Sequence, residues 1–201
     1  MATPIQRERA RHLPPAERRA QLVRAGIASF ANKGIDATKH ADLARACSVS
    51  VPTVFTYFPN RRALVNDILD EVGQAIIEQV VRPAQALEPA QQFMVTGPLY
   101  LALAERDPDC VKTWLSWSMH FEPRIQRAYR RYERRIVGDL ARMIDPDSTD
   151  EHDEAHDRAR MVLASSTYLA RMVFDGESEQ RREAFIQHVI GSITLGTETA
   201  K

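Results

Sequence analysis

The stretch HADLARACSVSVPTVFTYFPNRRAL, residues 40–64, decides the fold of this chain. A short run with apolar residues at i, i+4 spacing precedes Ser-Val-Ser, and a second short apolar run follows with Pro52 near its start. Helices this short are marginal in water because helix nucleation is costly. The pair therefore predicts a helix-turn-helix, in which both helices pack on a third and the second one enters the major groove of DNA.

The segment before residue 40 supplies the third helix. Proline suits a first helical turn, so this helix is predicted to begin near Pro14 or Pro15, and Gly34 provides its C-cap. Its apolar stripe and the inward residues of the short helices form one predicted core: Leu22, Val23, Ile27, Phe30, Leu43, Val49, Val54 and Phe58.

The rest of the chain also reads as helical. It has no sustained period-2 alternation and no Asn-Gly or Asp-Gly hairpin signal. A fourth helix should start after Asn60, which is a good N-cap, and stop at Pro83. Later helices are expected over 89–105, 108–119, 123–144, 150–174 and 178–195. The sequence thus predicts an all-α protein of about nine helices. We expect residues 1–60 to form a helix-turn-helix domain with a basic N-terminal arm, and residues 61–201 to form a helical regulatory and dimerisation domain.

Charge is divided unevenly along the chain. Residues 1–62 hold 11 Lys/Arg and 4 Asp/Glu, whereas residues 63–201 hold 16 and 23. A basic head on an acidic body indicates an anionic partner for the head, and nucleic acid is the most common large one. No apolar run is long enough to span a membrane, the N-terminus has no secretory signal pattern, and the two cysteines have no metal or disulfide spacing. We therefore expect a cytoplasmic protein with no membrane partner.

The second short helix offers small side chains to DNA. Hydroxyls of Ser50, Thr53 and Thr56 can bond to phosphates or base edges, while Val51 and Pro52 can contact thymine methyls. Arg61 stands at a helix start, where a cation is unfavourable unless a phosphate binds it. The basic arm either stays a solvated tail or reaches a minor groove. The predicted DNA-binding residues are Arg9, Arg11, Lys39, Ser50, Val51, Pro52, Thr53, Thr56, Tyr57 and Arg61.

These residues carry a family resemblance. The run GIDATKHADLARACSVSVPTVFTYFPNRRAL resembles the DNA-binding domain of the TetR family of transcriptional regulators, over about residues 13–69. With WLSWS at 114–118 it is most similar to the quorum-sensing master regulators of the LuxR/HapR/SmcR kind. The resemblance implies a homodimer that binds palindromic operator DNA, and a body that contains a ligand pocket and the dimer interface. We further expect the pocket to bind a small apolar effector, which the resemblance does not identify, and the sequence indicates no cofactor and no catalytic site.

The chain departs from the family pattern at three positions. A tyrosine that touches phosphate often stands in the family where this chain has Phe55, which lacks the hydroxyl. The nearer relatives tend to carry Ala and Asn where Pro52 and Thr56 stand. These changes leave the fold prediction intact, but they put the operator sequence in question because Asn and Thr offer different hydrogen bonds to a base.

Aromatic and apolar residues of the body have two interpretations. Their helical spacing favours core packing, which is the usual role of such residues. The family resemblance favours a ligand pocket, with Trp114 as its best-supported lining residue. The predicted lining is Ile76, Leu99, Leu103, Trp114, Trp117, Tyr129, Tyr132, Met143 and Met172. A ligand beside Trp114 is expected to tilt the helix that starts at Arg61.

The last two helices are apolar over too broad a face for one buried stripe. Small residues between the large ones let two helices approach closely. Pairing the same two helices from two subunits would make an isologous four-helix interface. Its predicted residues are Val162, Ser166, Leu169, Phe185, Val189 and Ile193.

Two further runs and two rival functions complete the predictions. The run RAYRRYERR, residues 127–135, reads as a solvated face or as a second anion-binding surface. His152 and His156 have metal-ligand spacing, but they lie among acids that suit the first turn of a helix.

A helical enzyme and a helical ligand-binding or scaffold protein are the rival functions, and neither predicts sequence-specific DNA binding. The sequence contains no phosphate loop, no GxSxG motif and no activated cysteine.

Overall fold

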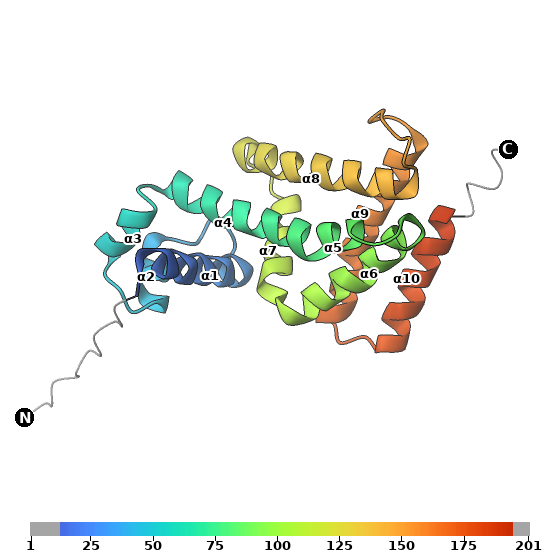
Figure 1. The fold of residues 1–201 in the computed structure, drawn as a ribbon. Coiled ribbons are helices and arrows are strands. Elements are labelled where there is room, and N and C mark those ends of the chain that lie inside the picture. Colours follow the sequence, from blue (N-terminus) through green and yellow to red (C-terminus); the bar gives the residue numbers. More distant parts are fainter. Residues whose placement is uncertain (1–12, 195–201) are drawn as a thin grey trace, which may run out of the picture.

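The computed structural model describes residues 13–194, and this part of the chain consists of helices and connecting turns without a strand (Figure 1). The all-α prediction is confirmed. The helices are α1 Pro15–Lys33, α2 His40–Ala46, α3 Val51–Tyr57, α4 Arg61–Ile76, a π-helical turn Ile77–Val81, α5 Arg82–Gln85, α6 Pro89–Arg106, α7 Pro108–Ser118, α8 Pro123–Ile144, α9 Glu154–Phe174 and α10 Glu179–Thr194. With 61–85 counted as one continuous helix, the described residues contain nine helices.

Helices α1, α2 and α3 lie together at one end of the molecule, and α4 runs from them into the body (Figure 1). Leu22, Leu43, Val54 and Phe58 are completely buried, so the core predicted for the helix-turn-helix forms. Gly34 ends α1 with φ of 86°, and its N–H donates to the carbonyl of Phe30 at 2.9 Å. The local signals for these helices were therefore sufficient.

The turn between α2 and α3 is tight. Ser48 adopts φ of 53°, in the left-handed region that residues other than glycine seldom occupy. Directly after it, the N–H of Val49 donates to the carbonyl of Ala44 at 3.0 Å. This geometry is what allows two seven-residue helices to cross and pack.

The prediction that the fourth helix stops at Pro83 is wrong. The chain passes from α4 into the π-helical turn 77–81 and stays helical to Gln85. The N–H of Arg82 donates to the carbonyl of Ile77, five residues back. Proline lacks an N–H and its ring clashes in a regular α-helix, whereas a wider π turn just before it relieves the clash.

The body packs around α4 and α7. Helix α8 lies along α4, and α9 and α10 cover the side away from α1 (Figure 1). Helix α7 stands between the two regions and packs on α1, α4, α6 and α8. Helix α9 begins at Glu154, later than predicted, because the Asp153 side chain caps it by accepting from the N–H of His156 at 2.8 Å. None of the helices within residues 13–194 is long and apolar enough to cross a membrane.

Candidate nucleic-acid interface and ligand cavity

Helix α3 presents one face to the core and the other to solvent. Val54 is buried, whereas Val51 is 38% exposed and Phe55 is 45% exposed. Of the predicted DNA contacts, Ser50, Val51, Pro52 and Thr56 are exposed, and Thr53 and Tyr57 are half-buried. The exposed face is therefore made of small hydroxyl and apolar side chains.

The hydroxyls on α3 also stabilise the helix that presents them. The Ser50 side chain caps α3 by accepting from the N–H of Thr53 at 3.2 Å, and the two hydroxyl oxygens lie 2.8 Å apart. The Thr56 hydroxyl donates to the carbonyl of Pro52 at 3.2 Å. The oxygens of Thr53 and Thr56 keep a free lone pair whichever of Ser50 and Thr53 donates to the other, so both can still accept a hydrogen bond from a base or from water.

His40 fixes the position of α3, a role that the sequence did not reveal. Its Nε2 lies 2.8 Å from the carbonyl oxygen of Phe58, beyond the C-terminus of α3. Its ring stacks on Phe55, with centroids 4.1 Å apart and planes at 7°. Phe55 thus serves as half of a stack that joins α2 to α3. The partners of His40 lie 15 to 18 residues further along the chain, and no local sequence pattern predicts such contacts. The role of His40 therefore could not be predicted from the sequence.

Arg61 binds protein instead of standing free at the helix start. Its guanidinium donates to the carbonyl oxygens of Thr38 at 2.6 Å, Ile35 at 2.9 Å and Asp36 at 3.0 Å. The Asp36 carboxylate lies 3.6 Å away. These carbonyls explain the cation at a helix N-terminus without a phosphate, so the expected reason for Arg61 no longer applies. The loop 35–38 is instead tied to α4 through this side chain.

Two other cations remain available on this part of the surface. Arg62 and Lys39 are exposed, and the ion pairs of residues 13–194 do not include them, whereas Lys33 pairs with Asp42 at 2.5 Å and Arg19 with Asp67 at 2.8 Å. The ammonium of Lys33 is the main cause that lowers the pKa of the Asp42 carboxyl. The predicted arm residues Arg9 and Arg11 lie outside the described residues.

The body contains an apolar cavity of about 70 Å³, partly open to the surface. Its walls come from α4, the π-helical turn, α6, α7, α8, α9 and α10. Of the nine predicted pocket residues, Ile76 and Trp114 line it. The lining residues that were missed come from the π-helical turn, α6, α8, α9 and α10. Most are aliphatic side chains, which carry no distinguishing sequence signal, but they include the aromatic residues Phe93 and Tyr100 on α6.

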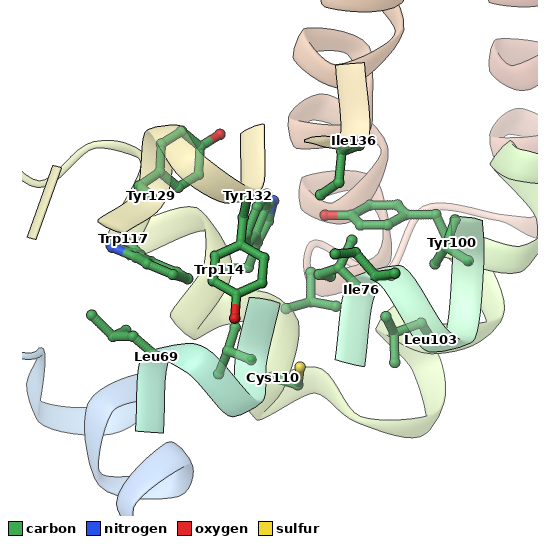
Figure 2. Packing of buried hydrophobic residues seen from close by; sticks show 14 of the residues in the cluster. Leu69, Ile76, Tyr100, Leu103, Cys110, Trp114, Trp117, Tyr129, Tyr132 and Ile136 are labelled. Atoms are coloured by element: carbon green, nitrogen blue, oxygen red, sulfur yellow. The ribbon is translucent and has the colours of Figure 1, made fainter. Parts of the chain in front are cut away.

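The other predicted aromatic residues form a packed cluster beside the cavity (Figure 2). The ring of Trp114 lies 5.0 Å from that of Tyr129, and Trp117 lies 5.7 Å from both Tyr129 and Tyr132. The Trp117 indole donates to the carbonyl of Ile125 at 2.9 Å. The cluster sits where α4 approaches α8 closely, since a Cβ at Gly73 would lie 2.6 Å from the Tyr132 ring. Trp117, Tyr129 and Tyr132, like Leu99, Leu103, Met143 and Met172, thus pack in or against the core and do not line the cavity.

The residues predicted for a dimer interface mostly face the same cavity. Five of them, Val162, Ser166, Leu169, Phe185 and Val189, line it, and the sixth, Ile193, is 2% exposed within the subunit. The breadth of the apolar surface on α9 and α10 is therefore largely explained by intrachain packing. Met161 and Tyr168 on α9, which are 56% and 51% exposed, form the large apolar surface that remains.

The two polar runs of the body have ordinary structural roles. His156 is buried, and its Nδ1 lies 3.0 Å from Asp153 and 3.1 Å from the Ser148 hydroxyl, so it belongs to the α9 cap. The described residues contain no group of three or more His, Cys, Asp or Glu side chains arranged to hold a metal ion. On α8, Arg127, Arg130 and Arg134 are exposed, and Arg131 pairs with Asp70 at 2.6 Å.

The chain has a helix-turn-helix head on a helical body that contains an apolar cavity, and it therefore belongs to the class of helix-turn-helix proteins. Residues 22–68 match the family described as bacterial regulatory proteins, tetR family. This segment is therefore similar to the N-terminal domain of the tetR family, and the resemblance noted from the sequence is confirmed.

Individual relatives agree with this assignment. The HTH-type transcriptional regulator LuxR of Vibrio harveyi is 33% identical over 110 residues, 53% of this chain and 52% of that protein, so the match spans about half of LuxR. A TetR-like transcriptional regulator from Rhodococcus sp. RHA1 superposes with a TM-score of 0.76 at 17% identity, covering 94% of this chain and 100% of the other.

Two solved structures of similar fold contain ligands. AibR in complex with isovaleryl coenzyme A and operator DNA has a TM-score of 0.70 at 14% identity, covering 87% of this chain and 97% of AibR. A transcriptional regulator from Saccharomonospora viridis in complex with choline has a TM-score of 0.71 at 17% identity, covering 89% and 96%. At these identities the likeness concerns the fold.

Proposed function

We propose that this protein is a transcriptional regulator that binds a palindromic operator as a homodimer and changes its operator affinity when a small apolar molecule occupies the cavity. The observation that carries the proposal is the solvent-exposed face of α3, within a segment that matches the tetR family. The likeness to LuxR supports a role in quorum-sensing-related gene control, exerted on DNA in the cytoplasm.

Each part of the head has a role in this proposal. Ser50, Val51, Pro52, Thr53, Thr56 and Tyr57 contact the major groove, and Lys39 and Arg62 contact phosphates. Arg61 acts indirectly, because its bonds to the 35–38 loop hold that loop against α4. Arg9 and Arg11 extend the contact as a basic arm.

Selection of bound sequences from a random duplex library tests the proposal. We expect an enriched palindrome, and an affinity that falls steeply with salt because phosphate contacts release counterions. Val51→Glu should abolish the selection by placing a carboxylate on the DNA face, while the matched control Gln91→Glu, on exposed α6 surface, should not. If the protein is instead a helical scaffold or a ligand-binding protein without DNA specificity, the wild type should enrich no sequence.

The second copy docks, in this proposal, on the outer faces of α9 and α10. Met161 and Tyr168 are large apolar side chains that the subunit leaves exposed, with the small residue Ala164 between them. On α10 the exposed Ala184 allows another helix to approach. An isologous pairing of this surface gives the dimer the two-fold symmetry that a palindromic operator has.

The cavity communicates with the head through α7 in addition to α4. Trp114 on α7 lines the cavity, and its neighbour Thr113 bonds to α1. AibR and the Saccharomonospora viridis regulator hold their ligands in proteins of this fold, which supports an effector role for the cavity here. The ligand can change operator affinity only by its difference in affinity for the two head positions.

A further inference from the structure

The polar groups of the cavity lining are few. Thr96, Tyr100, Ser165 and Ser166 contribute hydroxyls, and of the described residues no charged side chain lines the cavity. A charged ligand buried here would lose its hydration without gaining an opposite charge, which strongly disfavours it. The lining therefore selects an uncharged molecule.

Three of the four hydroxyls have already given their proton to the helix that carries them. Thr96 donates to the carbonyl of Phe93 at 2.8 Å and Ser165 to that of Met161 at 2.8 Å. Ser166 donates to the carbonyl of Leu163 at 2.6 Å. A ligand that bonded to these protons would have to break an existing hydrogen bond.

The hydroxyl of Tyr100 is different. Tyr100 is 5% exposed, and its oxygen is buried without a hydrogen-bond partner among residues 13–194. The Ser166 hydroxyl lies close enough to act on the phenol oxygen as a donor, which lowers the pKa of Tyr100, but the Tyr100 proton itself has no acceptor among residues 13–194. Burial raises the pKa of the phenol far above its usual value, so the group stays protonated and remains a donor.

The position of this donor suits a ligand. Figure 2 shows Tyr100 reaching from α6 toward Ile136 and Trp114, and all three residues line the cavity. The cavity has a volume of about 70 Å³, whereas an engineered cavity of about 150 Å³ is known to hold benzene. A ring-sized ligand must therefore push the walls apart, and the half-buried residues of α9 and α10 form the wall nearest the surface.

We propose that the cavity binds an uncharged, largely apolar molecule with one hydrogen-bond acceptor, such as a carbonyl oxygen, and that Tyr100 donates its hydroxyl proton to that acceptor. The inference rests on the proposed role of the cavity as effector site and adds the chemistry of the effector. It gives one tyrosine the task of orienting a ligand that otherwise binds by apolar contact.

A matched pair of probes tests this proposal on the full chain. Cyclohexanone and methylenecyclohexane have nearly the same shape, and differ in an oxygen acceptor that replaces a CH₂ group. Titrations followed by ligand-observed NMR give the affinity ratio of ketone to alkene for the wild type and for Tyr100→Phe. We expect the ratio to fall roughly tenfold in Tyr100→Phe, as loss of one buried hydrogen bond predicts, with alkene affinity unchanged. Cyclohexylamine and cyclohexanecarboxylate, which are charged at pH 7, should not bind.

Thermal stability separates a ligand donor from a structural one. If the Tyr100 hydroxyl has no protein partner, Tyr100→Phe should leave the melting temperature unchanged or raise it. If Tyr100→Phe and Ser166→Ala instead lower it by similar amounts, the two hydroxyls bond to each other and the proposal fails. An unchanged ketone-to-alkene ratio, binding of either charged probe, or no binding of any probe would also overturn it. None of these results bears on whether the protein selects an operator, which is measured separately.

Discussion

The hydroxyl of Thr113 on α7 donates a hydrogen bond to the carbonyl oxygen of Ile27 on α1, 3.2 Å away, and both groups are buried. The next residue, Trp114, lines the cavity of the body. Past the C-terminal end of α7, the imidazole of His120 lies 3.1 Å from the carboxylate of Asp36, in the loop that Arg61 binds. Helix α7 thus contacts the cavity through Trp114 and the head through Thr113, and the residue His120 just beyond it also contacts the head. A ligand that displaces α7 would therefore also displace the head.

Thr113→Val should weaken the coupling between ligand and operator. Valine keeps the volume of threonine and removes the donor, so we expect a loss of about 1 kcal/mol of stability, or roughly 2–4 °C in melting temperature. The effect of a saturating ligand on operator affinity should become smaller. Operator titrations with and without ligand measure it, and Ser116→Ala, exposed on the same helix, is the control. Undiminished coupling in Thr113→Val would show that the hydrogen bond from Thr113 to Ile27 does not transmit the effect of the ligand.

Substitution of Arg61 and of Arg62 should have different effects, because Arg61 has a structural role and Arg62 is proposed to bind DNA. Arg61→Ala removes the donor for three backbone carbonyls, so it should cost about 1–3 kcal/mol of stability, discounted for its partial exposure. Arg62→Ala should leave the melting temperature nearly unchanged, weaken all operator sequences about equally and reduce the slope of log affinity against log salt by about one. If the salt slope changed for Arg61→Ala and not for Arg62→Ala, the roles would be reversed.

The contrast between these arginines shows what the sequence could predict. The ends of the helices of the head follow from local signals such as Gly34 and Asn60, whose side chain accepts from the N–H of Ala63 at 2.9 Å. The partners of Arg61 lie 23 to 26 residues away, and the stack of His40 on Phe55 likewise depends on how two helices cross. The breadth of the apolar surface on α9 and α10 is visible in the sequence, but no sequence pattern distinguishes the wall of a cavity from a dimer interface. Fold class was therefore predictable, and side-chain assignments that depend on tertiary contacts were not.

His40→Ala should weaken operator binding although His40 is itself buried on α2 and reaches the exposed face of α3 only through its stack on Phe55. The change removes the bond to the carbonyl of Phe58 and the stack on Phe55, so we expect a loss of about 1–2 kcal/mol of stability. Operator affinity should fall equally for all sequences, because the position of α3 changes but its reading side chains do not. His152→Ala, at an exposed site of the body, is the control. A change of preferred sequence in His40→Ala would instead indicate that His40 takes part in readout.

Thr56→Ala should alter which bases the protein tolerates. The Thr56 hydroxyl is exposed on α3 and keeps a lone pair while it donates to Pro52, so it can contact a base edge directly. We expect relaxed specificity at one position of each half-site, worth about 1–3 kcal/mol between the best and the next base. Repeating the library selection with the variant measures this. An unchanged preferred sequence would show that Thr56 does not read bases.

A charge on the outer face of α9 should dissociate the dimer without unfolding the subunit. Met161→Glu with Tyr168→Glu places carboxylates on a solvent-exposed surface, and within the subunit it removes the contact between the rings of Tyr168 and Phe185, whose centroids lie 5.3 Å apart. An isologous interface would bury these carboxylates from both copies without a cation to pair with, so association becomes unfavourable. Sedimentation velocity should show a monomer with wild-type helix content by circular dichroism, and operator affinity should drop because one half-site binds alone.

Two controls give this experiment its force. Ala102→Glu, on the exposed face of α6, should stay dimeric, which shows that added charge as such has no effect. Ile193→Asp should behave differently from both, because Ile193 is 2% exposed within the subunit and a buried unpaired charge costs several kcal/mol. We expect Ile193→Asp to lower the melting temperature of the subunit, and we expect no folded monomer from it. If Ile193→Asp gave a stable folded monomer while the α9 variant remained a dimer, the interface would lie on the face that lines the cavity. A wild-type protein that sediments as a monomer at micromolar concentration would refute the dimer altogether.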